Sequence, residues 1–331
     1  MKSKVALAVF GALALTATAH AAEVYKDKTT DINVYGFVNG EHYFVEHGKK
    51  NGFDGSEAQL GVKAKQQLND QFALFGQYEG RVKAAQHGQK HRLQNRQAWA
   101  GIDANEYGAV TIGRQNGLIY DVSGLSDMAI NLSGMGASAD TALLGRSDGI
   151  IQYANTFDFV KVIGQYKMSQ TSDSFETGLP VNQGQAYGAA VLLTDINGTG
   201  LGGGLGYAHG DAGDASVHNG AYVAQESDTY TGALTYIKGP VYAAATTVVG
   251  KNIQKVKSYY DDEVYVQYAF DNGIAPAINY TSTNAGAKHQ EYVEPDITYS
   301  FNKNVSTGVG YGIDVTGDND NVVKTFLKYQ F

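Results

Sequence analysis

Few residues in this sequence have the types and spacing that catalysis requires. His87 and His91 lie four positions apart, a spacing that creates a metal site only on a helix, and the residues around them favour a solvated loop. Gly198, Gly200 and Gly203 match the spacing of a dinucleotide-binding turn, but the residues that follow, GLGYAHG, are typical of a strand and not of the required helix. No Gly-x-Ser-x-Gly elbow and no His-Glu-x-x-His motif is present. We therefore expect no enzymatic activity.

In several segments, charged residues instead recur at every second position. On a strand this spacing places them on one face, where together they could set an electric field in water. In FALFGQYEGRVKA, residues 72–84, Glu79, Arg81 and Lys83 share one parity, whereas Leu74 and Tyr78 share the other. Successive side chains of a strand point to opposite faces, so this segment is predicted to have one polar and one apolar face. The same alternation is present in DEVYVQYAF and in NVVKTFLKYQF.

The chain begins with a leader typical of exported proteins. Lys2 and Lys4 precede the apolar run 5–15, and a small-residue cleavage site follows, so residues 1–21 are predicted to be a cleaved signal peptide. Without the two lysines the formal charge changes from −8 to −10, an acidic balance that argues against binding nucleic acid. There is no cysteine for disulfides, and no later segment has the roughly twenty apolar residues of a spanning helix.

Short alternating segments cover most of the remaining sequence. About sixteen are predicted, at 31–46, 56–67, 72–86, 93–103, 108–114, 149–155, 159–169, 185–194, 200–210, 224–237, 239–250, 262–271, 274–284, 290–301, 304–315 and 321–331. Tight turns rich in Asn, Asp and Gly alternate with long polar loops, which is the layout of an all-β, 16-stranded antiparallel transmembrane β-barrel. Pro276 and Pro295 fall inside two segments, and we expect them at strand starts or bulges because proline lacks a ladder donor.

A soluble β-sandwich or propeller is the competing structural interpretation. Two features disfavour it. Tyr and Phe concentrate near the ends of the segments, as in the aromatic girdles of membrane barrels, and nearly every segment has an apolar face opposite a polar one. In lipid the apolar face points outward, and the ring must close because unpaired backbone groups in hydrocarbon cost several kcal/mol each.

One long stretch without alternation, from Gln115 to Asp148, interrupts this pattern. Sixteen strands enclose an aqueous channel. Without an obstruction, this channel would admit large molecules. The stretch is long enough to fold back into the lumen as a constriction loop of the single domain 22–331, and Leu118, Ile119 and Leu125 are predicted to anchor a short helix there. A loop lying over the mouth of the barrel is the alternative.

Several segments in the same order resemble the trimeric general diffusion porins of Gram-negative outer membranes, the general bacterial porin family. They are DINVYGFVNGEHYF, GRQNGLIYDVSGLSDM, NGIAPAINYTST, FNKNVST and the final YQF. The resemblance implies a homotrimer in the bacterial outer membrane, reached through the periplasm, with a third loop folded inward. It also implies a channel for passive diffusion of ions and small hydrophilic solutes.

The resemblance also implies which residues line the constriction, where acids on the loop face basic residues on the wall. Matching and substituted positions give six candidates: Asp127, Asn131, Arg96, Arg146, Gln59 and Phe37. The polar parity of residues 72–84 adds three more, Glu79, Arg81 and Lys83. The first family acid matches Asp127, whereas the second is replaced by Asn131. Two basic positions match Arg96 and Arg146, and two others are replaced by Gln59 and Phe37. Glu79, Arg81 and Lys83 are expected to compensate in part.

This constriction is expected to be weakly charge-selective. Mobile ions screen a charge over about 8 Å, so wall charges act mainly where the passage is narrow. The net charge of −10 favours cations, whereas Arg96 and Arg146 act in the opposite direction. The alternative is a substrate-selective channel, for example for oligosaccharides, in which Phe37 and Tyr265 would offer flat apolar faces. Trp99, opposite in parity to Arg96, is expected to point outward.

No cofactor is expected. Two acidic groups, 261–263 and Asp314 with Asp318 and Asp320, could hold divalent cations that bridge lipopolysaccharide, but soluble hydrophilic loops are the favoured explanation. The expected partners are other copies of this chain, lipopolysaccharide and outer-membrane lipid, and small hydrophilic solutes and ions.

Overall fold

A computed structural model describes most of the chain. The described residues are 22–46, 52–83, 93–132, 143–173, 180–211, 216–218, 221–223, 226–253, 256–286 and 288–331. The predicted signal peptide, the two loop histidines and residues 133–142 of the long stretch lie outside this set. None of the described helices has the length and hydropathy to cross a membrane.

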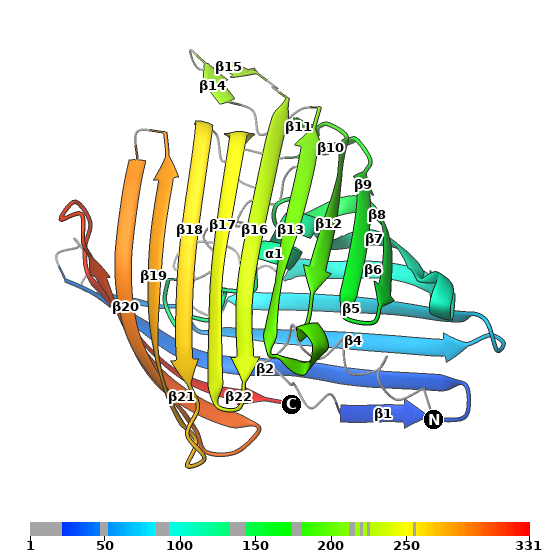
Figure 1. Cartoon of the computed structure of the whole chain (residues 1–331), viewed down its shortest axis with the longest axis horizontal. Helices are drawn as coiled ribbons and strands as arrows, with labels where there is room; N and C mark the ends of the chain where they lie inside the picture. The colour runs from blue at the N-terminus through cyan, green and yellow to red at the C-terminus, as the bar shows by residue number, and fades with distance from the viewer. Residues whose placement is uncertain are drawn as a thin grey trace.

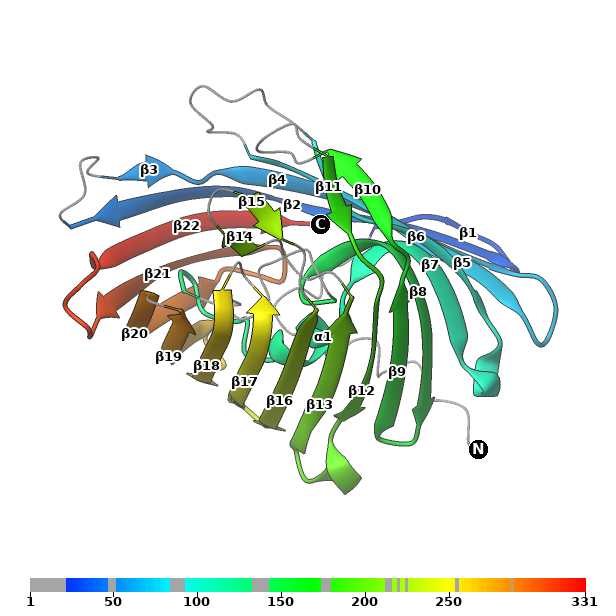
Figure 2. The same cartoon turned by 90° about the horizontal axis from the view of Figure 1, so that it is seen from above.

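The dominant element is a closed, 16-stranded antiparallel β-barrel, as predicted (Figure 1, Figure 2). Each long strand pairs with the next along the chain. The strands are β2 (Thr30–Val45), β4 (Glu57–Gln67), β5 (Ala73–Lys83), β6 (Gln94–Asp103), β7 (Ala109–Asn116), β8 (Arg146–Phe157), β9 (Val160–Lys167), β12 (Ala186–Leu193), β13 (Leu201–Gly210), β16 (Ser227–Lys238), β17 (Val241–Ile253), β18 (Val256–Tyr268), β19 (Ile274–Ala285), β20 (Lys288–Ser300), β21 (Val305–Asp314) and β22 (Val322–Gln330).

Strand β2 closes the ring. Its first ten residues pair with β4, and its second half pairs with β22 on the other edge, from Phe37 opposite Gln330 to Val45 opposite Val322. The short strand β1 (Ala22–Lys26) continues that edge, because it pairs with β2 just beyond the point where Phe331 bonds to Gly36. The two ends of the described chain therefore lie along one edge of one strand.

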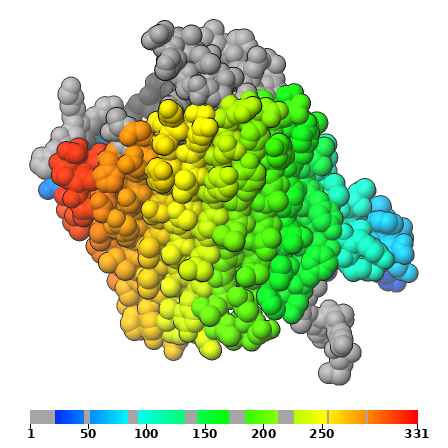
Figure 3. Space-filling view, turned by 45° about the horizontal axis from the view of Figure 1, so that its top comes forward, coloured from blue at the N-terminus to red at the C-terminus, as the bar shows by residue number. Residues whose placement is uncertain are grey.

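Side chains alternate in exposure along each strand, as the sequence predicts. In β16, Thr229, Thr231 and Ala233 are buried, whereas Tyr230 and Leu234 on the other parity are exposed, Leu234 by 73%. The exposed parity faces outward and forms a continuous wall across the green to orange strands (Figure 3). In water such a surface would be unfavourable, so this alternation is the one expected for a barrel surrounded by lipid.

The strand predictions fail mainly at their ends. β18 begins at Val256, six residues before the predicted start at 262, because the acidic run 261–263 lies inside the strand and not in a loop. Both prolines lie inside strands, where the ladder lacks partners on one side. Pro276 lies beyond the last β18–β19 pair, at Ala277, and Pro295 lies between the β20–β21 pairs of Val293 and Asp296.

Short elements complete the connections. The small strands β10 (Gln170–Asp173) and β11 (Pro180–Gln183) form one hairpin, and β14 (Ser216–His218) and β15 (Ala221–Val223) form another, both on the end of the barrel that carries the long loops (Figure 1). β3 (Phe53–Asp54) pairs with β2. The tight turns at the opposite end contain the 3₁₀ turns η2 (Asn105–Tyr107) and η4 (Ile196–Gly198).

The glycines of the dinucleotide-like motif have a structural role. Gly198 has φ of 75° and Gly200 has φ of 84°, values that favour glycine, and both lie in the turn that joins β12 to β13. Their spacing therefore reflects a tight turn and not a phosphate-binding loop.

Candidate functional site

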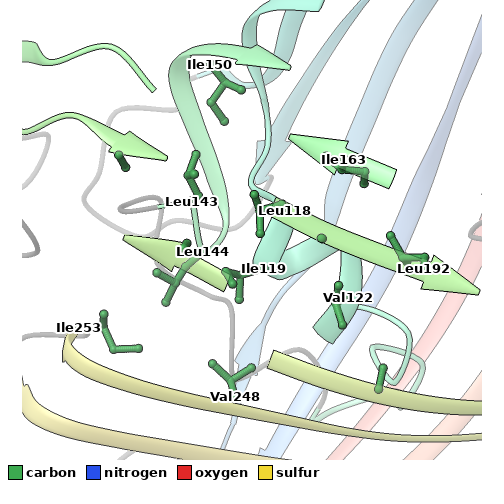
Figure 4. Close-up of a cluster of buried hydrophobic side chains, with 14 of the residues drawn as sticks. Leu118, Ile119, Val122, Leu143, Leu144, Ile150, Ile163, Leu192, Val248 and Ile253 are labelled. Atoms are coloured by element: carbon green, nitrogen blue, oxygen red, sulfur yellow. The ribbon is translucent and has the colours of Figure 1, made fainter. Parts of the chain in front are cut away.

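The long stretch enters the barrel as a short helix, α1 (Leu118–Ser123), which lies within the ring of strands (Figure 2). Leu118, Ile119 and Val122 are fully buried and pack with side chains of the surrounding wall such as Leu192 and Val248 (Figure 4). The predicted short helix is present, with Leu118 and Ile119 anchoring it as expected. The predicted third anchor, Leu125, is partly buried against the same cluster.

Glycines on the inner wall make room for this helix. A Cβ at Gly188 would lie 2.9 Å from Cδ2 of Leu118, and one at Gly204 would lie 3.3 Å from Cγ1 of Val122. The glycine-rich sequence of β13 thus has a packing reason, since a larger side chain would displace α1 from the wall.

Beyond α1, the stretch follows the inner wall and is fastened to buried side chains of several strands. The Ser126 hydroxyl donates to Oε2 of Glu263 at 2.8 Å, and the backbone N–H groups of Asn131 and Leu132 donate to the two carboxylate oxygens of Glu294, each at 2.8 Å. Asn279 donates to the carbonyl of Leu132 at 2.7 Å. These bonds satisfy groups that would be costly to bury unpaired.

The acidic run of β18 therefore does not form an exposed cluster. Asp261 and Glu263 are 4% and 2% exposed and point inward, whereas Asp262 has the opposite parity. The expectation of an acidic loop cluster at 261–263 is wrong, because β18 begins at Val256 and holds all three carboxylates within the strand.

Arg96 and Glu79 form the centre of the opposite wall. Nε of Arg96 lies 2.8 Å from Oε1 of Glu79, and the Tyr35 hydroxyl donates to Oε2 of the same carboxylate at 2.9 Å. Gln77 donates to the Tyr35 oxygen at 2.6 Å. One carboxylate thus holds an arginine and a phenol from two different strands in fixed positions.

Arg81 lies beside this group and contacts three of its neighbours. Its Nε and Nη2 donate to Oε1 of Gln59 at 3.0 and 2.8 Å, and Nη1 lies 3.1 Å from Oε1 of Glu57. Its Cζ lies 5.4 Å from the centroid of the Phe37 ring. Lys83 has the same parity and pairs in register with Glu57, and its side chain is exposed.

Within the described part of the loop, Asp127 is the carboxylate that bonds to α1 in this region. The Tyr120 hydroxyl of α1 donates to Oδ2 of Asp127 at 2.8 Å. Burial, followed by the Asp127 charge, raises the pKa of Tyr120 above its usual range, and the positive charges of Arg146 and Arg96 act in the opposite direction. Tyr120 therefore lies in the combined field of the loop acid and two arginines of the wall.

Asn131 differs from Asp127 in its surroundings. Its Nδ2 donates to the carbonyl of Val322 at 3.3 Å while its backbone bonds to Glu294, so the side chain is engaged with the wall. Of the nine predicted residues, Asp127 and Arg146 therefore lie near Tyr120, and Asn131 lies at a separate attachment point. The other six lie on the β2–β6 wall: Phe37, Gln59, Glu79, Arg81, Lys83 and Arg96.

Comparison with known proteins agrees with this architecture. The family model described as Gram-negative porin matches residues 27–331. The chain is a Gram-negative porin. It is 30% identical to outer membrane porin N of Escherichia coli, with all of both chains covered.

Solved structures are similar too. The porin has a TM-score of 0.81 with OmpF of Salmonella typhi in complex with daunomycin, at 25% identity, over 93% of this chain and all of that one. The trimer form of OmpT from Vibrio cholerae shares the fold at a TM-score of 0.64 and 16% identity, over 92% of this chain and all of that one. The porin is therefore a channel for passive diffusion across the bacterial outer membrane and not an enzyme, as predicted.

The expected outward orientation of Trp99 in this porin is wrong. Glu79 pairs with Gln97 while Gly80 pairs with Asn95, so Arg96 is the extra residue of a β-bulge and the parity changes there. Trp99 faces the same side as its partner Gln77, donates to Oε1 of Gln97 at 2.9 Å, and packs edge-on against Phe75 at 5.3 Å.

Sequence reasoning also missed several residues that line this porin. They are Tyr35, Tyr120, Glu57, Lys63, Lys324 and Lys328. The polar parity of KTFLK already assigns Lys324 and Lys328 to the inner face, but only closure of the ring shows that they lie beside β2.

Proposed function

We propose that the passage of this porin is narrowest where α1 and residues 124–132 face the β2–β6 wall. In this proposal the stretch 115–148 is the constriction loop, and the charges around it select weakly among small hydrophilic solutes. The loop carboxylate Asp127 and the arginines Arg96 and Arg146 carry most of the field, because charges act on a solute only within about 8 Å.

The observation that supports this proposal is the environment of Tyr120. The Tyr120 hydroxyl on the inward helix donates to Asp127, and the positive charges of Arg146 and Arg96 also act on it. Opposite charges from loop and wall therefore act on one point inside the ring. Selectivity is expected to be weak because Arg96 and Arg81 each have a carboxylate partner on their own wall.

Single-channel recording in planar bilayers with a KCl gradient tests the proposal. Arg96→Ala and Arg146→Ala are each expected to increase conductance and to shift the reversal potential toward cation preference. Lys303→Ala, in an exposed turn, removes the same charge away from the proposed constriction and serves as the control. Unchanged conductance and selectivity in both arginine variants would contradict the proposed site.

The oligosaccharide-selective alternative is not favoured. Tyr265 points inward as expected, but it is only 1% exposed and packs against Tyr242 with ring centroids 6.2 Å apart. It therefore offers no free face to a sugar. Permeation that rises linearly with solute concentration supports the general channel, whereas saturation by sugars would support the alternative.

We also infer that three copies of the chain assemble as a homotrimer. Support comes from family membership and from the trimer form in which OmpT of Vibrio cholerae, a protein of the same fold, has been solved. Light scattering of the detergent-solubilised protein is expected to give three chains per particle, and a monomer would contradict the inference.

Lipopolysaccharide is the proposed lipid partner at the rim that carries the long loops. Asp262 and Glu291 have outward parity, and both pair in register with Ser282 of the strand between them. Divalent cations shared between these carboxylates and lipid phosphates would join protein to lipid. Asp262→Asn combined with Glu291→Gln is expected to lower the lipopolysaccharide phosphate that copurifies with the porin, and an unchanged amount would refute the proposal.

A further inference from the structure

Three aromatic residues of β2 share the inward face, and each holds a lysine against its ring. Nζ of Lys63 lies 5.1 Å from the ring centroid of Tyr35, Nζ of Lys328 lies 4.7 Å from that of Phe37, and Nζ of Lys324 lies 4.9 Å from that of Tyr43. We call these six residues the aromatic–lysine strip. Their separations are those of cation–π contacts.

The strip is assembled from distant parts of the chain. Its rings belong to β2, Lys63 belongs to β4, and Lys324 and Lys328 belong to β22. Phe37 occupies a position where a family lysine is expected, and Lys328 of the neighbouring strand places an ammonium group over that ring instead. Positive charge is therefore retained here, supplied by a different strand.

A ring holds a cation without cancelling its charge, whereas a carboxylate cancels it. Among the described residues, neither Lys63 nor Lys328 has a carboxylate within 4.0 Å. Lys324 differs, since its Nζ lies 3.1 Å from Oε2 of Glu41. Arg81 also contacts Phe37, but Glu57 pairs with it. Lys63 and Lys328 are thus the lysines of the strip that have no carboxylate in direct contact among the described residues.

The strip is open to solutes. Lys63 is exposed, and Phe37 and Lys328 are half-buried on the inward face. An anion that reaches Lys328 therefore also meets the Phe37 ring. Because an ammonium and a guanidinium group already lie over that ring, we expect a solute to meet its edge.

We propose that the aromatic–lysine strip is a weak binding site for small aryl carboxylates in transit, centred on Phe37 and Lys328. The carboxylate pairs with the ammonium group of Lys328, and the solute's ring packs against the edge of Phe37, an edge-to-face contact that aromatic pairs prefer. A sugar is a poorer fit, because its flat apolar face requires a free aromatic face. The site lies on β2 and β22 and does not depend on the proposed role of the loop.

Current block in planar bilayers tests the site, with benzoate as the probe and acetate, benzyl alcohol and benzylammonium as matched solutes. Half-maximal block by benzoate is expected at a concentration about 2- to 10-fold below that for acetate, the range that one aromatic pair supplies. The neutral alcohol and the cation are expected to block less than benzoate does. Equal block by benzoate and acetate would overturn the proposal.

Two variants separate the contributions of charge and ring. Lys328→Gln is expected to weaken block by benzoate and by acetate alike, whereas Phe37→Leu is expected to remove only the advantage of benzoate. Lys303→Gln and Phe75→Leu are the controls and are expected to retain it, since Lys303 lies in a turn and Phe75 packs on Trp99 with no lysine over its ring among the described residues. Folding of each variant is checked by circular dichroism.

Wild-type behaviour in both Phe37→Leu and Lys328→Gln would place the site elsewhere. Loss of the benzoate advantage in Phe75→Leu would likewise assign binding to the Trp99 region and refute the strip.

Discussion

Nε of Arg96 lies 2.8 Å from Oε1 of Glu79, so the arginine at the centre of the wall is paired with an acid of its own wall. Removing that acid should expose its charge to passing ions. Glu79→Gln is expected to raise the anion-to-cation permeability ratio by about 2- to 5-fold, the range of a partly exposed ion pair. Reversal potentials in a KCl gradient measure this ratio.

The matched control for Glu79 is Glu106→Gln, which removes a carboxylate from the η2 turn at the end of the barrel. It is expected to leave the ratio unchanged. A shift toward cations in Glu79→Gln would show that Glu79 does not offset Arg96.

Asp127 is the carboxylate that the loop presents near Tyr120. Asp127→Asn is expected to shift selectivity toward anions, because it removes a negative charge that opposes those of Arg96 and Arg146 at Tyr120. Asp195→Asn, in the turn between β12 and β13, is the comparison that removes an acid elsewhere. Identical reversal potentials in both variants would remove Asp127 from the proposed constriction.

Tyr120 itself gives a pH prediction. Its pKa is raised, chiefly by burial, so the phenol remains neutral at pH values where an ordinary tyrosine starts to ionise near pH 10. Replacement by phenylalanine should therefore leave the pH dependence of conductance between pH 8 and 10 unchanged. A step in the wild-type curve that disappears in Tyr120→Phe would show that the phenol does ionise.

Leu118 anchors α1 to the wall and is fully buried. Leu118→Ala removes buried methyl groups and is expected to weaken docking of the helix by about 2–5 kcal/mol. Greater open-channel current noise and faster proteolysis within the stretch would report a loosened loop. Leu205→Ala removes the same atoms from an outward position that is 71% exposed, and it should behave as the wild type does.

Asp27 stabilises the turn that joins β1 to β2. Its Oδ1 accepts backbone N–H bonds from Thr29 and Thr30, each at 2.7 Å, and these bonds lower the pKa of Asp27 to about 2 from an ordinary value of 3.8. A lowered pKa means that the stabilisation is complete above pH 3.8 and disappears as pH falls through about 2.

Amide exchange of β1 measures this effect. Protection of β1 is expected to be constant from pH 7 down to about 4 once intrinsic exchange is corrected, and to be lower in Asp27→Ala at every pH in that range. Equal protection in the variant would show that the carboxylate does not hold the turn.

The barrel was predictable because alternation is a local property. The residues of each strand show by their alternation which parity faces lipid, and the tight turns mark where the chain reverses direction. The ring of strands from β2 to β22 therefore follows from segments considered one at a time. The short helix was predictable for the same reason, since Leu118, Ile119 and Leu125 are close together in a stretch that lacks strand-like alternation.

The constriction residues were only partly predictable. Arg96 was assigned correctly to the inner wall, yet the bulge at that residue reversed the parity assigned to Trp99. A bulge adds one residue to one strand of a pair, and no feature of the isolated strand marks it. Alternation set Glu263 opposite Val264, on the polar parity, but only the structure shows that Ser126 of the long stretch covers it.

The amino-acid sequence by itself determined the number of strands, the facing of the regular ones and the position of the long stretch between them. Only the tertiary structure decided which charges meet. Lys328 reaches Phe37 because closure of the ring places the last strand beside the first, and that contact spans almost the whole chain. Side-chain parity repeats over two residues, whereas closure depends on the register of every strand pair in between.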